Sequence, residues 1–111
     1  QNKMIGYIIG LPLEMLNKEP WALVDNNFGK SNTVYTYAFV IQKHYKGNGY
    51  AKMLKKVYLN WIKKQNKIVY VTGHVREGVT SKFTGDINIE EKVKNWQGTG
   101  KNFEYYRRVL K

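Results

Sequence analysis

The sequence predicts an α/β domain organised around a strand, a glycine-rich loop, a helix and a second strand. Three observations predict this class. Residues 33–41 form an apolar run rich in β-branched and aromatic side chains, which is typical of a strand. The stretch Lys46-Gly47-Asn48-Gly49-Tyr50-Ala51 follows, and residues 51–65 then repeat apolar side chains at helical spacing. A strand therefore leads through a glycine turn into an amphipathic helix.

The helix is expected to begin near residues 48–50 and to run to about Gln65, because glycine and asparagine start helices better than they continue them. Asn48-Gly49 is also a common hairpin turn, but the helical periodicity that follows argues against a hairpin. One face is expected to pack on the sheet and the other to meet water. The apolar face holds Met53, Leu54, Val57, Tyr58, Trp61 and Ile62, and the polar face holds Lys52, Lys55, Lys56, Asn60, Lys63 and Lys64.

The run from Phe39 to Leu54 resembles the acetyl-coenzyme A (acetyl-CoA) signature of the GNAT N-acetyltransferase superfamily. That signature is a strand, then Arg/Gln-x-x-Gly-x-Gly/Ala, then a helix. Gly49 and Ala51 match it, and Lys46 stands where the family usually has Arg or Gln. The resemblance implies an α/β fold with a mixed, largely antiparallel central sheet. It also implies a single domain over residues 1–111 that lacks the family's N-terminal strand and helices.

The resemblance further implies that acetyl-CoA is the co-substrate and that its acetyl group passes directly to an amine. A glycine-rich loop at a helix N-terminus offers unpaired N–H groups to a phosphate. In the family such a loop holds the pyrophosphate, the end of the preceding strand holds pantetheine, and an N–H near Ile41 polarises the thioester carbonyl. The residues implied here are Phe39, Val40 and Ile41 for pantetheine and Lys46, Gly47, Asn48, Gly49, Tyr50 and Ala51 for the pyrophosphate.

Four strands are expected besides residues 33–41. An apolar strand from residue 3 ends near Pro12, and residues 67–73 form a strand parallel to 33–41, because a single helix crosses between them. Residues 86–96 and 103–110 alternate apolar and polar side chains as strands do. An insertion with a short helix near residues 19–24 joins the first two strands. It is either a surface loop with one buried Trp or a source of substrate contacts from Glu14, Glu19, Trp21 and Asp25.

Catalytic residues are less well defined by the sequence. His74 follows the second parallel strand, where ligands of α/β sheets bind, and its imidazole is suited to accept a proton from an amine. A water held by Glu14 is the alternative base, and a structural role is the alternative for His74. The family's usual Asn and Tyr are absent from residues 75–83. Tyr106 or Tyr105 could replace the missing acid, unless both side chains only pack in the sheet.

Composition limits the remaining possibilities. The chain has 111 residues and no cysteine, which excludes disulfides, thiolate metal sites and cysteine nucleophiles. Its two histidines have no acidic partner at a fixed spacing, so no metal is expected. No apolar run reaches the roughly 18 residues that a membrane helix needs, so a cytoplasmic protein without a membrane partner is expected.

The net charge of +11 suggests two kinds of anionic partner. The lysines are spread along the chain instead of forming one block, so nucleic acid is the weaker alternative and the phosphates of coenzyme A the stronger. The other alternative is a GNAT-like domain that binds CoA or a protein without catalysis. The acceptor amine is expected on a small molecule or peptide, and an open sheet edge would favour a homodimer.

Overall fold

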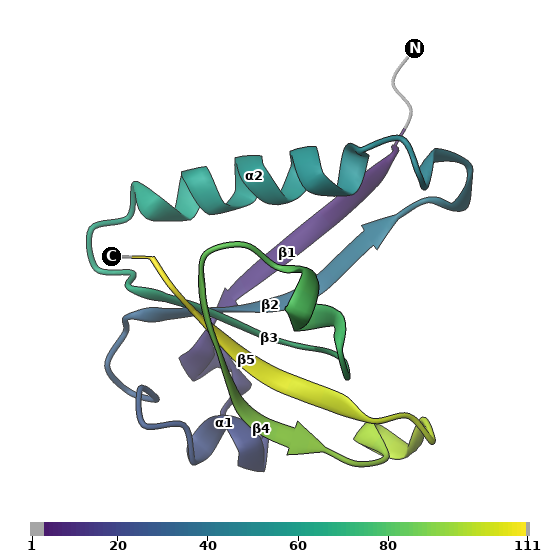
Figure 1. The fold of residues 1–111 in the computed structure, drawn as a ribbon. Coiled ribbons are helices and arrows are strands. Elements are labelled where there is room, and N and C mark those ends of the chain that lie inside the picture. Colours follow the sequence, from purple (N-terminus) through teal and green to yellow (C-terminus); the bar gives the residue numbers. More distant parts are fainter. Residues whose placement is uncertain (1–3, 111) are drawn as a thin grey trace.

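The computed structural model describes residues 4–110, which form a five-stranded sheet with a helix on each face (Figure 1). The strand order is β1-β2-β3-β5-β4. The strands are β1 (Gly6–Pro12), β2 (Thr33–Ile41), β3 (Tyr70–Arg76), β4 (Asp86–Val93) and β5 (Phe103–Val109). The α-helices are α1 (Pro20–Leu23) and α2 (Tyr50–Lys63), and 3₁₀ turns occur at Leu13–Leu16, Lys43–Tyr45, Val79–Lys82 and Trp96–Gly98.

The sheet is mixed and largely antiparallel, as the sequence predicted. Within residues 4–110, β2 and β3 are the one parallel pair, and α2 makes the crossover between them. Their pairing runs from Thr33 opposite Tyr70 to Thr36 opposite Gly73 and stops there. Beyond this point β2 continues beside β1 and β3 continues beside β5, so the two strands separate.

Each face of the sheet has its own core, because successive side chains of a strand point to opposite faces. On the α2 face, Tyr58 and Ile62 of the helix pack with Val71 of β3. On the α1 face, the insertion between β1 and β2 packs on the sheet through side chains that include Leu13, Ala22, Tyr35 and Tyr105. We refer below to the α2 face and the α1 face.

Helix α2 packs on the sheet with only part of the face that its apolar pattern indicated. Tyr58 and Ile62 are buried as expected, but Met53, Val57 and Trp61 are 59%, 61% and 62% exposed. Lys55, which was expected in water, lines a cavity beneath the helix. The reason is geometric: Lys55 and Tyr58 lie three positions apart and therefore share one side of the helix. The side of the helix that faces the sheet therefore includes residues from both the predicted apolar face and the predicted polar face.

Strand boundaries differ from prediction where turns intervene. The strand predicted at 67–73 begins at Tyr70 and extends to Arg76, because Ile68 N–H closes a turn onto the carbonyl of Gln65 after the helix. The strand predicted at 86–96 ends at Val93, because Asn95 has a φ of 50° and starts a turn. The predicted start of the first strand at residue 3 lies outside the described residues.

Candidate active site

The glycine loop forms an open hollow at the N-terminus of α2. Gly47 and Gly49 have φ values of 82° and 78°, which side chains with a Cβ rarely adopt. No side chain caps the start of the helix, so its first N–H groups remain available to a ligand. The hollow measures about 500 Å³. Its lining residues are Phe39, Val40, Ile41, Tyr45, Lys46, Gly47, Gly49 and Ala51.

Two of the nine predicted cofactor residues do not line this hollow. The side-chain amide of Asn48 donates to the carbonyl of Tyr45, at 3.5 Å, and the ring of Tyr50 packs edge-on against the Tyr45 ring. Both side chains therefore contact Tyr45 and do not line the hollow. The other seven predicted residues all face the same space.

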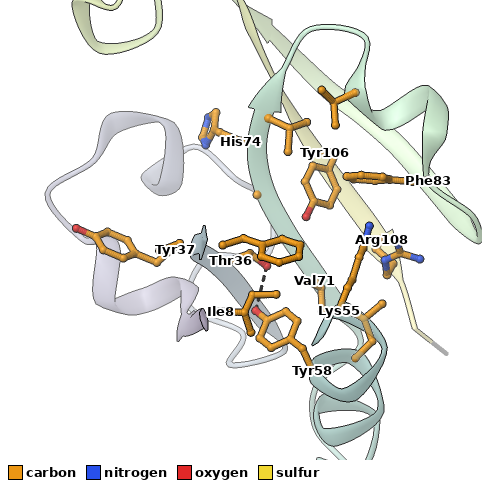
Figure 2. A pocket seen from close by; sticks show the side chains of 16 residues that line it. Ile8, Thr36, Tyr37, Lys55, Tyr58, Val71, His74, Phe83, Tyr106 and Arg108 are labelled. Atoms are coloured by element: carbon orange, nitrogen blue, oxygen red, sulfur yellow. Dashed lines mark hydrogen bonds between the residues drawn. The ribbon is translucent and has the colours of Figure 1, made fainter. Parts of the chain in front are cut away.

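A second cavity opens where β2 and β3 separate. It measures about 310 Å³ and lies between α2 and the sheet, and Figure 2 shows side chains from both converging on it. Because pairing with β3 ends at Thr36, the edge of β2 from residue 37 onward has no strand beside it there. Phe39 lines this cavity and also the glycine-loop hollow, so the two spaces are neighbours along β2.

Tyr106 brings a buried hydroxyl to this cavity from the sheet. It comes from β5, is 6% exposed, and faces the gap between the strands (Figure 2). Gly73 makes room for it, since a Cβ at that position would lie 3.0 Å from the Tyr106 ring. Burial raises the pKa of the Tyr106 hydroxyl, so the group stays protonated at neutral pH and can donate a hydrogen bond.

A third hollow, of about 580 Å³, lies on the α1 face of the same gap and is lined largely by aromatic side chains. Thr36, Tyr37 and His74 line both this hollow and the cavity on the α2 face. The two spaces therefore adjoin at the gap between β2 and β3. The remaining lining residues are Leu16, Glu19, Trp21, Tyr35, Trp96, Gln97 and Phe103.

His74 stands where the two spaces meet. Its Nδ1 lies 2.8 Å from the Tyr35 hydroxyl, and its ring stacks on Trp96 with centroids 3.9 Å apart. Its Nε2 is buried and has no hydrogen-bond partner among the described residues. Burial lowers the pKa of His74 to about 4, so the imidazole is neutral at pH 7. In the tautomer that donates Nδ1–H to Tyr35, Nε2 carries a free lone pair.

The predicted contacts from the insertion divide into two groups. Glu19 and Trp21 line the hollow on the α1 face, where the Trp21 indole N–H donates to the Glu19 carboxylate at 3.2 Å. Glu14 lies elsewhere and accepts hydrogen bonds from the backbone of Gly29 and Ser31. It holds the loop before β2 and lines none of the three spaces, so it is a poor position for a water-bound base.

Asp25, the fourth insertion candidate, is a structural anchor. Its carboxylate accepts hydrogen bonds from the Arg107 guanidinium and from the Tyr105 hydroxyl. Its side chain is only 1% exposed. Tyr105 thereby commits its hydroxyl to the α1 face, which leaves Tyr106 as the tyrosine that faces the cavity on the α2 face.

Several lining residues were not predicted from the sequence. Tyr35 and Trp96 meet His74 only because β2, β3 and the turn after β4 converge in the fold. The inward position of Lys55 could have been predicted, because Lys55 shares a side of the helix with the predicted apolar residue Tyr58. The position of Trp96 could not, since Trp96 was expected inside a strand.

Two kinds of feature are absent from the described part of the chain. No helix there is long and apolar enough to cross a membrane. No group of three or more His, Asp or Glu side chains in residues 4–110 is arranged to hold a metal ion.

No protein-family model and no curated protein matches this chain. Solved structures do. The NatC complex bound to Gag peptide and CoA matches 96% of the chain with a TM-score of 0.69 at 12% identity, and the match covers 62% of the NatC chain. Ard1 from Thermoplasma volcanium matches 96% of the chain with a TM-score of 0.67 at 15% identity, and the match covers 64% of Ard1.

A third structure, from Desulfovibrio desulfuricans and assigned to the acetyltransferases of the GNAT family, matches 99% of the chain with a TM-score of 0.66 at 15% identity, and the match covers 64% of that chain. The chain has the GNAT acetyltransferase fold. It spans just under two thirds of the length of these structures. In this GNAT fold, the glycine-loop hollow, the cavity at the strand gap and the hollow beside His74 are neighbouring spaces.

Proposed function

We propose that this chain transfers the acetyl group of acetyl-CoA directly to an amine. One observation carries the proposal: the hollow at the glycine loop adjoins the cavity between β2 and β3, and that cavity adjoins the aromatic hollow on the opposite face. A donor bound along the α2 face would thus meet an acceptor bound on the α1 face. The CoA bound to the NatC structure supports this choice of donor.

The residues of the loop fit the donor. Gly47 and Gly49 let the backbone approach a pyrophosphate closely, and Lys46 adds a positive charge beside the uncapped N-terminus of α2. The free edge of β2 at residues 37–41 offers main-chain groups to a pantetheine arm. When bound, acetyl-CoA supplies the activated thioester.

His74 and Tyr106 are assigned the two proton transfers. As the amine nitrogen forms its bond to the acyl carbon, His74 accepts the amine proton at Nε2, which is buried in the free chain and must be reached by the amine when the acceptor binds. As the carbon–sulfur bond breaks, the sulfur leaves with the electron pair and takes a proton from the Tyr106 hydroxyl. Both side chains then exchange protons with water and return to their neutral forms. The low pKa of His74 keeps it in the accepting form at neutral pH.

A second function, CoA binding without catalysis, is favoured by one feature. Where many GNAT domains have a last helix with an Asn and a Tyr, this chain has the end of β3 and the 3₁₀ turn Val79–Lys82. A domain of this kind would bind the donor without turnover on any amine.

Calorimetric titration of acetyl-CoA into the chain tests the proposal, with Gly49→Trp as the blocking variant. Gly100→Trp is the matched control, because Gly100 also has a positive φ, of 74°, with open space where a Cβ would stand. We expect saturable binding by the wild type and by Gly100→Trp, and none by Gly49→Trp.

Turnover is then measured as release of free thiol with a panel of peptide and small-molecule amines. The chain itself has no cysteine, so the thiol assay has no background from the protein. Binding with thiol release supports acetyl transfer, and binding without it supports the second function. A folded chain that binds no acetyl-CoA excludes both.

A further inference from the structure

Two basic side chains face the cavity between α2 and the sheet. Lys55 reaches it from the helix and Arg108 from β5, and Figure 2 shows their charged ends beside one another, close to Phe83 and Tyr106. No Asp or Glu is among the residues that line this cavity. The cavity therefore concentrates positive charge on its inner wall.

Their surroundings provide little compensation for these charges. The Lys55 ammonium lies 3.3 Å from the centre of the Phe83 ring, and Arg108 donates one hydrogen bond, to the Thr84 carbonyl. Neither forms an ion pair with a carboxylate of residues 4–110. Burial and the nearby Arg108 lower the pKa of Lys55 to about 8, and burial also lowers the pKa of Arg108. An anion placed between them would relieve both effects.

The cavity has room for such an anion. Its volume is about 310 Å³. A space of this size is larger than a single water molecule needs. An acetyl group has only three heavy atoms and would leave room in this cavity, whose wall includes Lys55 and Arg108.

We propose that this cavity binds acyl groups that end in a carboxylate, with Lys55 and Arg108 as the pair that holds the carboxylate. This inference rests on the proposed function, because it takes the gap between β2 and β3 as the place of the thioester. The preferred donor is then the CoA monothioester of a short dicarboxylic acid. A guanidinium binds a carboxylate through two parallel N–H groups, and the ammonium of Lys55 adds a third donor. The transfer chemistry is unchanged.

Calorimetry with matched donors tests the inference. Succinyl-CoA and butyryl-CoA have acyl chains of equal carbon number and differ in the terminal carboxylate. We expect the wild-type chain to bind succinyl-CoA about tenfold more tightly than butyryl-CoA. Lys55→Met should remove this preference, and Lys55→Arg should retain it. Lys56→Met is the control, because Lys56 is the exposed neighbour on the same helix and its loss should leave the preference intact.

Free CoA and free succinate complete the design. If CoA binds and the chain does not prefer succinyl-CoA to butyryl-CoA, the inference is wrong and the proposed function stands. The same conclusion follows if Lys55→Met, shown to be folded by circular dichroism, keeps the preference. If free succinate binds without displacing acetyl-CoA and succinyl-CoA shows no advantage, the pair binds anions outside the donor path, which also overturns the inference. If neither CoA nor any thioester binds, both proposals fail.

Discussion

The two faces of the sheet assemble their functional surfaces in different ways. On the α2 face, the glycine-loop hollow is formed by the loop, the edge of β2 and the start of the helix, which come from one stretch, residues 39–51. On the α1 face, the hollow around His74 takes side chains from the insertion, β2, β3, the turn after β4, and β5. The first surface is local and depends on backbone conformation. The second depends on long-range register, and it should be the more easily disrupted.

The largest expected effect tests this dependence at Asp25. Asp25→Asn removes a buried carboxylate from Arg107 and Tyr105, leaving Arg107 with the half-exposed Glu90. Breaking a buried ion pair at one partner costs about 3 kcal/mol, so the free energy of unfolding should fall by about that amount in urea denaturation. Asp86→Asn, at an exposed strand end, is the control. A loss below about 1 kcal/mol would mean that the α1 face does not depend on this anchor.

Tyr106→Phe and Tyr105→Phe compare the faces at adjacent residues. Under the proposed function, Tyr106→Phe should lower the rate constant for thiol release about 100-fold, because general acid catalysis is lost, while donor affinity is kept. The Phe ring can still pack against Gly73 and Phe83. Tyr105→Phe should weaken the contact with Asp25 and lower stability, with a smaller effect on the rate. Equal rate losses in the two variants would contradict the assignment of Tyr106 as the acid.

The pH dependence of stability probes His74. Its pKa is about 4 in the folded chain and about 6.5 when unfolded, so between these values the unfolded chain binds more protons. The free energy of unfolding should therefore fall as the pH drops from 6.5 toward 4. With partial solvent screening, we expect His74 to account for about 2 kcal/mol of that fall.

Urea denaturation across this pH range measures the effect. His74→Gln should flatten the dependence by that amount, and His44→Gln, at an exposed position, should not. Identical slopes for the wild type and His74→Gln would show that the imidazole is not desolvated by the α1 face.

The smallest expected effect is local to the α2 face. Glu104 is 2% exposed and accepts hydrogen bonds from the Gly78 N–H, the Thr80 N–H and the Thr80 hydroxyl. These hydrogen bonds hold the turn at Val79–Lys82 in place, and Val79 of this turn lines the cavity. Glu104→Gln should cost about 1 kcal/mol and speed amide hydrogen exchange at Gly78 and Thr80. Exposed Glu91→Gln should leave that exchange unchanged.

The local surface could largely be predicted from the sequence. The bounds of β2 at Thr33–Ile41 were predicted correctly, and seven of the nine predicted cofactor residues share one hollow. Glycines at positive φ before an amphipathic helix define such a loop without knowledge of the rest of the chain. Whether these residues bind a cofactor stays a prediction.

The long-range surface could not be predicted in the same way. The end of a parallel strand indicated His74, but its partner Tyr35 lies 39 positions earlier and is brought close by the register of β2 and β3. Lys55 was predicted to face water because it is a lysine, although its position on the helix places it beside Tyr58. Trp96 reaches His74 only because β4 ends early in a turn. Each of these depends on how distant segments pair, which local pattern does not encode.

The meeting of two spaces at His74 also constrains kinetics. Since donor and acceptor would approach the gap from opposite sides of the sheet, neither would have to leave before the other enters. Direct transfer through the gap then requires both to be bound at once. Initial rates measured against both substrates should give intersecting double-reciprocal lines. Parallel lines are the signature of a covalent acyl-enzyme relay.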